Sequence, residues 1–346
     1  MRAVVFSEHG GPEVLQLVEL PTPVPGPGQV RIRVAASSLN HLDLWVRRGL
    51  PLRIPMPHIG GSDMAGWVDA VGPGVDAVLE GARVVVDPTL DWAWITGVRR
   101  GGPPELEFRV LGEHTQGAFA EFALAPAENL RHVPDHVAFE TAAAAGLVFV
   151  TAWRALFGRG GLQAGERVLV TGGSGGVATA AVQLARQAGA EVFVLTSGEA
   201  NVQRLQALGA HHALDRTAGS PADLLRAATG RRGVDLVVDS VGEVLWETLI
   251  RTLAPAGRLV TYGATTGPRA VTDLRHVFWK QLSILGTTMG SPADFTRAME
   301  MVFRGDVAPV IHRVVPLADL RGAQEELEAG DVFGKIVVVP EPGGAA

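Results

Sequence analysis

A glycine-rich turn in the middle of the chain limits the possible folds more than any other feature. Residues 167–171 (RVLVT) have the composition of a buried strand, GGSGG follows, and a helix is expected over residues 177–188. Gly173, Gly175 and Ala178 satisfy the G-x-G-x-x-G/A pattern in the strand–turn–helix setting that it requires. Glycine lets the backbone approach a pyrophosphate closely, and a helix start offers free N–H groups and a positive dipole end. The turn therefore predicts a dinucleotide-binding βαβ unit.

Short apolar runs alternate with helical segments around and after this turn. The expected strands are residues 167–171, 191–196, 211–215, 235–240, 258–263 and 283–289, and the expected helices are residues 177–188, 199–208, 221–229 and 243–253. Strands that are separated by helices pair in parallel through right-handed crossovers. We therefore expect a doubly wound α/β sheet in this part of the chain.

The first third of the chain has β character instead. Its short apolar runs are separated by turn-forming residues, which is typical of a barrel or sandwich, and they are residues 2–6, 14–19, 29–36, 65–71, 82–87 and 118–124. A helical segment follows at residues 134–156, and the tail has an expected helix at 292–304 and strand at 335–340. At about 150 residues per domain, a chain of 346 residues predicts two domains.

The composition excludes several classes of protein. The chain has no cysteine, so disulfides, thiolate nucleophiles, thiolate-bound zinc and iron–sulfur clusters are excluded. A net charge of −6 disfavours nucleic acid as a partner. The longest strongly apolar run, residues 142–153, is shorter than the roughly 20 residues that cross a bilayer, and the first residues lack the features of a signal peptide. We expect a soluble, cytoplasmic protein that binds neither membranes nor nucleic acid.

The end of the second expected α/β strand indicates which cofactor is preferred. Sites for NAD place a carboxylate about 20 residues after the glycines, where it binds the ribose 2′-hydroxyl. Here Thr196 and Ser197 occupy that place, and Glu199 is expected to begin the next helix. Without a carboxylate a 2′-phosphate is not repelled, and the Ser197 hydroxyl can hydrogen-bond to it. Arg204, or with less support Arg216, would supply positive charge, although Arg204 also fits a solvated helix face. We therefore favour NADP(H) over NAD(H).

Further segments, taken in order, resemble the medium-chain dehydrogenase/reductase superfamily, which contains zinc alcohol dehydrogenases, quinone oxidoreductases and enoyl reductases. They are GGPEVLQLVELPTPVPGPGQVRIRV, SLNHLDLWVRRG, IGGSDMAGWVDAVGPGV, GAFAEFALAP, ETAAAAGLVFVTAWRAL, VLVTGGSGGVATAAVQLA and VDLVVDSVGEVLWETLIRTLAPAGRLVTYGATTG. The resemblance covers nearly the whole length. It implies a GroES-like β domain of residues 1–126 and 291–346, a Rossmann domain of residues 127–290, and a cofactor in the cleft between them.

The same resemblance implies particular cofactor contacts and an assembly. The expected contacts, besides Ser197 and Arg204, are Thr151, Gly173, Ser174, Gly175, Gly176, Val177, Gly263, Ala264 and Thr288, with Thr151 and the last three near the nicotinamide. In relatives the strand that matches SILGTTM often pairs across a two-fold axis, so we expect a homodimer. The expected partner besides the cofactor is a small-molecule substrate.

The chain departs from the family at the positions of the metal ligands. Zinc-dependent relatives have a catalytic cysteine where this chain has Asn40, and a His-Glu pair where it has Ser62 and Asp63. The remaining ligand position is Leu147, and the hydroxyl of the proton relay is replaced by Leu42. Zinc prefers thiolate, imidazole or carboxylate ligands. We therefore expect no catalytic zinc and no alcohol oxidation by the zinc mechanism.

A second metal site of the family is also altered. Residues 88–112, which lack periodicity, match the segment in which many relatives bind a structural zinc with four cysteines. The four positions hold Asp91, Trp94, Gly97 and Glu105. We expect Trp92 and Trp94 to anchor this loop in place of the metal. A different metal site made of His41, His58 and Asp63 is a minor alternative, and His41 also lies near where relatives contact the cofactor phosphates.

Hydride transfer to an activated double bond is the chemistry that remains without zinc. Asn40 is expected to contact the substrate carbonyl through its neutral amide, because it stands at a metal-ligand position. Asp43 would orient Asn40 or a water, or act as a structural cap. Ser62 and Asp63 would hydrogen-bond within the floor of the cleft, or Asp63 would act directly in catalysis. Candidates for an apolar substrate pocket, with core packing as the alternative, are Trp45, Trp92, Phe278 and Met289.

Three functions are therefore compatible with the sequence. The leading interpretation is a zinc-independent NAD(P)H-dependent oxidoreductase that transfers hydride to an enone, a quinone or another small carbonyl compound. The second is an NAD(P)-dependent alcohol dehydrogenase. The third is a nucleotide-binding regulatory protein with little turnover. No H-E-x-x-H motif points to a zinc protease.

Overall fold

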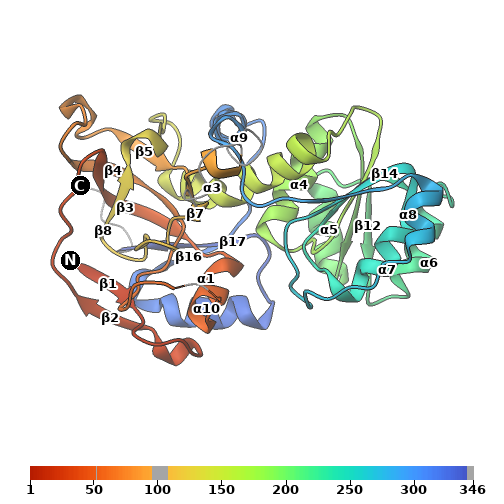
Figure 1. Ribbon diagram of the computed structural model, residues 1–346, viewed down its shortest axis with the longest axis horizontal. Coiled ribbons are helices and arrows are strands. Elements are labelled where there is room, and N and C mark those ends of the chain that lie inside the picture. The colour runs from red at the N-terminus through yellow and green to blue at the C-terminus, as the bar shows by residue number, and fades with distance from the viewer. Residues whose placement is uncertain (52, 96–107, 341–346) are drawn as a thin grey trace. The chain divides into compact units, whose positions relative to one another are not determined.

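The computed structural model describes residues 1–51, 53–95 and 108–340 of the chain (Figure 1). They form two compact units, one of Met1–Leu147 with Ser291–Ala346 and one of Val148–Gly290. The expected boundary at residue 127 lies earlier than this division. Residues 127–147 belong to the first unit because β9 (Leu130–His132) pairs with β5 (Arg83–Val86), and because residues in the first half of α3 (Phe139–Trp153) hydrogen-bond to side chains of that unit.

The second unit is a six-stranded parallel sheet with helices between its strands, which confirms the expected α/β class. Its strands, in the spatial order β12-β11-β10-β13-β14-β15, are His212–Asp215, Glu191–Thr196, Arg167–Val170, Val234–Asp239, Leu253–Thr261 and Ser283–Gly286. Their inner positions are almost continuously apolar, as strands covered on both faces require. The strand order reverses between β10 and β13, and such a switch point is where open α/β sheets bind ligands.

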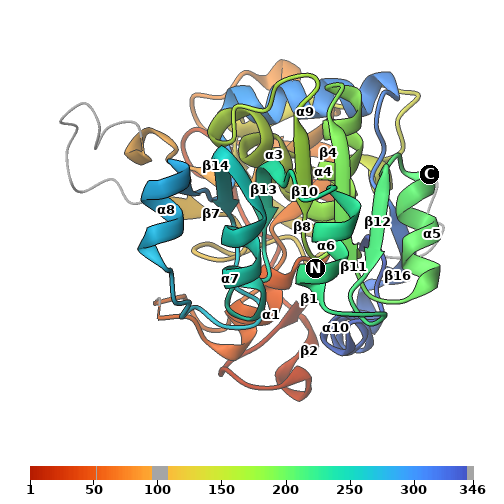
Figure 2. The ribbon, with the colours of Figure 1, turned by 90° about the vertical axis from the view of Figure 1, so that its right-hand side faces the viewer.

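The helices α4 (Gly176–Gln187), α5 (Glu199–Ala207), α6 (Pro221–Ala228) and α7 (Glu243–Thr252) begin and end close to the expected positions. A further helix, α8 (Leu274–Lys280), follows them in the chain. Figure 2 shows α6 and α7 side by side in front of the strands. Helix α8 was not expected, and no residue of it is buried.

The first unit is built on a mixed sheet that is antiparallel except for the parallel pair β16–β17, and the β-rich pattern of the first third predicts strands here. Its path is β16-β17-β3-β4-β5-β9, and β8 also pairs with β3. The other strands of this sheet are β3 (Gln29–Ser38), β4 (Asp63–Val71), β8 (Phe122–Pro126), β16 (Ile311–Pro316) and β17 (Lys335–Val339). Two small sheets add β1 (Arg2–Val5) with β2 (Gln16–Glu19), and β6 (Thr89–Leu90) with β7 (Arg109–Val110).

Among the described elements, α1 (His41–Arg48), α9 (Pro292–Arg304) and α10 (Leu320–Ala329) also belong to this unit. Neither α1 nor α10 was expected, and their anchor is a fully buried cation, Arg47. Its guanidinium donates to the Gln324 side chain at 2.7 Å and to the Gly10 carbonyl at 2.9 Å, and it also pairs with Glu328. Since a buried charge is tolerated only when paired and hydrogen-bonded, this set fixes α1 against α10.

The helical stretch Phe139–Arg159 is longer than the apolar run that the sequence showed. By length and composition it could cross a membrane, but 72% of its apolar window is buried inside the structure. It continues from α3 into a π-helical turn, Arg154–Arg159. A core helix of a water-soluble protein has the same properties, so this segment is weak evidence for a membrane span.

Candidate active site

The glycine turn after β10 has the geometry of a phosphate cradle. Gly172 has a positive φ of 64°, and a Cβ on Gly173 would lie 2.9 Å from side-chain atoms of Leu205 and Val194. Gly175 is the N-cap of α4, and no side chain caps that helix end. The first N–H groups of α4 are therefore left for a ligand, and the dipole there favours an anion. These positions are the loop residues that the sequence predicted.

A buried carboxylate holds the base of this turn. Asp239, at the end of β13, accepts a 2.6 Å hydrogen bond from the Thr171 hydroxyl and further bonds from the N–H groups of Val241 and Gly242. Burial raises the pKa of Asp239, and the three donors oppose that rise. The ends of β10 and β13 are thus locked together at the switch point. Sequence analysis did not single out this residue, although an aspartate that ends an apolar strand is a usable signal.

The end of β11 brings Ser197 and Arg216 together. The Arg216 side chain donates from Nε to the Ser197 hydroxyl at 2.7 Å, while the Gly198 N–H donates to Asp215. Arg204 is exposed on α5. Among the described residues, the Thr196 hydroxyl is buried without a hydrogen-bond partner. The structure therefore places the Arg216 cation beside Ser197, and Arg204 stays a prediction.

The remaining expected cofactor contacts lie in the same unit. Gly263 and Ala264 follow β14 after one intervening residue, and Thr288 lies two residues after the end of β15 and is exposed. Thr151 lies on α3, and its hydroxyl is buried and unpartnered among the residues that the structure describes. Buried hydroxyls normally have a partner, so Thr151 and Thr196 are positions that a bound ligand would satisfy.

A substitution at Gly175 separates cofactor binding from folding. A Cβ there would meet only the Gly172 carbonyl oxygen, at 3.3 Å, and the φ of −75° suits alanine. We expect G175A to fold as the wild type does but to raise the dissociation constant for NADPH by about 10- to 100-fold, because close approach of the pyrophosphate to charge-assisted N–H donors is lost. Fluorescence titration measures the affinity. The control is G322A on α10, where an added Cβ would meet no atom within 4 Å. Unchanged affinity in G175A would contradict the assignment of this turn as the pyrophosphate site.

In the first unit, the buried carboxylate of Asp63 is the centre of the polar cluster. Its Oδ1 accepts from the Leu147 N–H at 2.7 Å. Its Oδ2 accepts from the Asn40 amide and the Ser38 hydroxyl, both at 2.9 Å. The Ser38 hydroxyl also lies 3.1 Å from the Ala143 carbonyl. Asp63 therefore joins the end of β3 and the start of α1 to α3.

Lys335, at the start of β17, completes this cluster, and sequence analysis missed it. Its ammonium donates to the Leu39 carbonyl and the Asn40 amide oxygen, both at 2.5 Å, and lies 3.4 Å from Asp63 Oδ2. Burial lowers the pKa of Lys335, and Asp63 and Asp43 oppose that change. One of only two lysines in the chain, at the head of the apolar run KIVVV, was the available signal.

Asp43 binds backbone rather than the Asn40 side chain. One oxygen accepts from the Asn40 N–H at 2.7 Å and the other from the Gly61 N–H at 3.1 Å. Burial raises the pKa of Asp43 to about 7. Of the two expected roles, the contacts match the structural cap, and the cap also ties α1 to the turn before Ser62. The Ser62 hydroxyl itself is fully buried and has no partner among the described residues, so of the hydrogen bonds expected for Ser62 and Asp63 only those of the Asp63 side chain are formed.

The donor set of this cluster does not fit a zinc ion. Asn40 and Asp63 already bind Lys335, Ser62 offers a neutral hydroxyl, and Leu147 has no donor side chain. Within residues 1–51, 53–95 and 108–340, no group of three or more His, Asp and Glu could hold a metal. The alternative of His41, His58 and Asp63 is therefore not assembled. His58 instead places Nε2 3.0 Å from the Gly112 carbonyl, and His41 is exposed.

The segment that matches the structural zinc lobe is pinned at its base. Strands β6 and β7 pair there, Arg109 forms an ion pair with Asp91 at 2.7 Å, and the Trp92 ring packs edge-on to Phe108. Trp92 thus contributes an apolar anchor. Gly97 and Glu105 lie outside the described residues.

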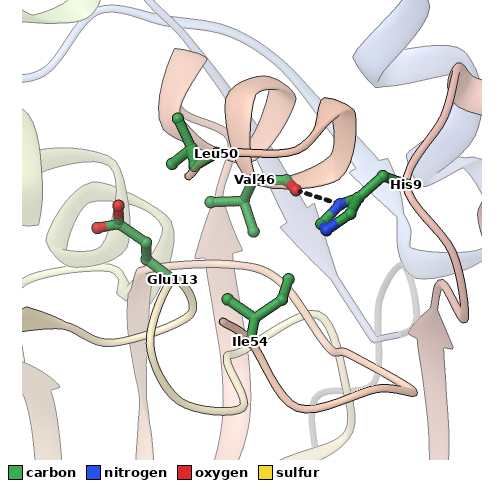
Figure 3. Close-up of a pocket in the computed structure, with 5 residues that line it drawn as sticks. All are labelled: His9, Val46, Leu50, Ile54 and Glu113. Carbon is green, nitrogen blue, oxygen red and sulfur yellow. Dashed lines mark hydrogen bonds between the residues drawn. The ribbon is translucent and has the colours of Figure 1, made fainter. Parts of the chain in front are cut away.

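A narrow slot lies beside the C-terminal end of α1. Figure 3 shows the apolar side chains of Val46, Leu50 and Ile54 between His9 and Glu113. His9 hydrogen-bonds to the Val46 carbonyl, whereas Glu113 points away from His9. Burial raises the pKa of Glu113 to about 7, so the slot is lined on one side by a carboxyl group that titrates near neutral pH. Sequence analysis did not single out Glu113.

The four candidates for an apolar pocket are not equivalent. Met289 is buried, as core packing predicts, and Trp45 is half-buried on α1 below Arg48. Phe278 is 65% exposed on α8, which contradicts core packing, while its place in a substrate pocket stays a prediction. Its exposure follows from α8, which buries none of its residues.

Comparisons with known proteins agree with both units. A model described as zinc-binding dehydrogenase matches residues 176–304, and one described as alcohol dehydrogenase GroES-like domain matches residues 26–135. A quinone oxidoreductase from Lama guanicoe is 31% identical over 348 residues, covering 98% of this chain and 97% of that protein. The chain belongs to the medium-chain dehydrogenase/reductase superfamily. The resemblance stated from the sequence motifs is confirmed, and the protein is an oxidoreductase of a family that binds nicotinamide cofactors.

Solved structures of the superfamily share the whole fold. An NAD-dependent alcohol dehydrogenase superposes with a TM-score of 0.91 at 39% identity, covering 99% of this chain and all of that one. A cobalt- and zinc-bound thermostable alcohol dehydrogenase from Pyrobaculum aerophilum has a TM-score of 0.88 at 36% identity, covering 98% of this chain and 99% of that one. Similar folds thus occur with metal bound, and the donor set decides whether a given chain fits a metal.

Proposed function

We propose that this oxidoreductase uses NADPH, without zinc, to reduce small enones, quinones or related carbonyl compounds. The observation that carries the proposal is the cluster of Asn40, Asp63 and Lys335, in which amide, carboxylate and ammonium groups satisfy one another where a metal would need free donors. A cytoplasmic location and a small-molecule substrate are part of the same proposal. The curated quinone oxidoreductases among its relatives support the substrate class.

The chain's own residues would bind and orient the reactants. Bound NADPH supplies a hydride to the electron-poor carbon of the substrate. The glycine turn and the start of α4 hold the pyrophosphate, and Asp239 keeps that turn in place. In the first unit, Asn40 keeps one amide N–H beyond the one that Asp63 accepts, and this neutral donor would polarise a carbonyl. Asp43 and Asp63 position Asn40, and each of their carboxylate oxygens accepts at least one hydrogen bond.

Arg216 and Ser197 support the preference for NADP(H). A guanidinium and a hydroxyl 2.7 Å apart at the end of β11 form a pair that can bind a 2′-phosphate. Asp215, which precedes Arg216 in the chain, accepts hydrogen bonds on Oδ1 from the N–H groups of Gly198 and Thr217. These contacts favour the phosphorylated cofactor over NADH.

Replacing Arg216 tests this preference. We expect R216A to weaken NADPH binding by about 10- to 100-fold, the value of one or two charge-assisted hydrogen bonds, and to leave NADH binding nearly unchanged. Parallel titrations with both cofactors measure the effect. R226A, which removes a surface arginine paired with Asp223 on α6, is the control. Equal losses for NADPH and NADH, or tighter binding of NADH by the wild type, would overturn the assignment.

Turnover over a substrate panel tests the proposed function itself. We expect the purified protein to oxidise NADPH with quinones or enones, to contain no stoichiometric zinc, and to keep its activity in a chelator. Stoichiometric zinc with chelator-sensitive alcohol oxidation would favour the alcohol dehydrogenase alternative. Tight NADPH binding without turnover on any quinone, enone or aldehyde would favour the regulatory protein.

A homodimer is a further part of the proposal. Strand β15 lies at the edge of its sheet and pairs only with β14 within the described residues, and Ile284 on it is 40% exposed. Such an open edge is available for pairing with a second copy. We expect sedimentation to give the mass of two chains, and I284D to shift the protein toward one. A monomeric wild type would exclude the dimer.

A further inference from the structure

The hydroxyl of Ser62 is a buried polar group that the cluster around Asp63 does not use. The residue is fully buried, and within the described residues its Oγ has no hydrogen-bond partner. Buried hydroxyls are normally paired, and an exception calls for a reason such as a ligand that binds there. Ser62 differs in this from Ser37 and Ser38 of the same unit, whose hydroxyls donate to the Val338 carbonyl and to Asp63.

Two ties hold Ser62 beside Asn40. The N–H of the preceding residue, Gly61, donates to Asp43, which also accepts from the Asn40 N–H. The carboxylate of the following residue, Asp63, accepts from the Asn40 amide at 2.9 Å. The segment that carries Ser62 is therefore bound to the start of α1 on both sides of this residue.

The backbone around Ser62 leaves it little freedom to move. The Gly60 and Gly61 carbonyls accept from the N–H groups of Phe119 and Ala118 at 3.0 and 2.9 Å. A Cβ on Gly112 would lie 2.9 Å from the Ser62 nitrogen, so the two chain segments approach as closely as glycine allows. A donor on such a frame is preorganised, which is the condition under which a hydrogen bond stabilises a transition state most.

The amide of Asn40 has much less capacity left. A lysine ammonium only donates and a carboxylate only accepts. The Asn40 oxygen must therefore face Lys335 and its nitrogen must face Asp63, which leaves one N–H. By contrast, the whole hydroxyl of Ser62 is unused.

We infer that the Ser62 hydroxyl is a catalytic hydrogen-bond donor to the substrate's carbonyl oxygen. The inference rests on the proposed reduction of enones and quinones. When the substrate accepts a hydride at the carbon conjugated to its carbonyl, an electron pair moves onto the carbonyl oxygen. Ser62 donates a hydrogen bond to that oxygen and keeps its proton, and a proton from solvent completes the reduction. The substrate class is thus one with a hydrogen-bond-accepting oxygen conjugated to the reacting carbon.

Ser62→Ala, compared with wild type and Ser37→Ala, tests the inference. We expect S62A to lower kcat for the enone or quinone that the wild type reduces by about 100-fold, the effect of losing one oxyanion donor, and to leave the dissociation constant of NADPH unchanged. Its Tm should equal or exceed that of the wild type, because an unpaired buried hydroxyl is removed. The control S37A loses a hydrogen bond to Val338, so its Tm should fall while its kcat is retained.

The outcomes separate this inference from the proposed function. Wild-type kcat in S62A, or a Tm below that of the wild type, would overturn the inference alone, since the hydroxyl would then be idle or structural. A wild type that reduces no member of the panel would overturn the proposed function and the inference together.

Discussion

The buried carboxylate of Asp63 is the interaction on which the candidate site of the first unit depends. An ionised group with no exposure to water is tolerated only when several donors surround it, and Asp63 has the donors of Ser38, Asn40 and Leu147 with the ammonium of Lys335. These donors come from β3, α1, α3 and β17. Removing one partner would leave an uncompensated buried charge, so the four elements are held together as a set.

Close backbone approach is the second constraint. A Cβ on Gly146 would lie 2.5 Å from Asp63 Oδ1, so glycine is needed where the carboxylate reaches the Leu147 N–H on α3. In the other unit, a Cβ on Gly173 would meet Leu205 and Val194, and glycine again permits the turn that leads into α4. At both places the backbone can approach its neighbours closely because glycine has no side chain.

How much of the fold the sequence predicts depends on the length and regularity of each element. The strands β10, β11 and β13 and the helix α4 were expected within a few residues, because a buried parallel strand is continuously apolar and an amphipathic helix has a clear period. The pattern missed α1, β16 and α10. Helix α1 has eight residues and ends in two arginines, one of them fully buried, and β16 carries His312 and Arg313 beside its apolar residues. Their conformations depend on tertiary contacts such as those of Arg47.

The residues of the candidate site divide in the same way. By itself the sequence determined the superfamily, the phosphate-binding turn and the replacement of metal ligands by Asn40, Ser62 and Leu147, because residue types at given spacings suffice for these. Tertiary structure alone decided that Arg216 lies beside Ser197, that Lys335 binds Asn40, and that the Ser62 hydroxyl has no partner among the described residues. These facts depend on which side chains lie close together in space. The residues concerned are separated in the sequence, and Asn40 and Lys335 are the most widely separated pair. Local propensity carries no information on such distances, because only the packing of whole elements brings those side chains together.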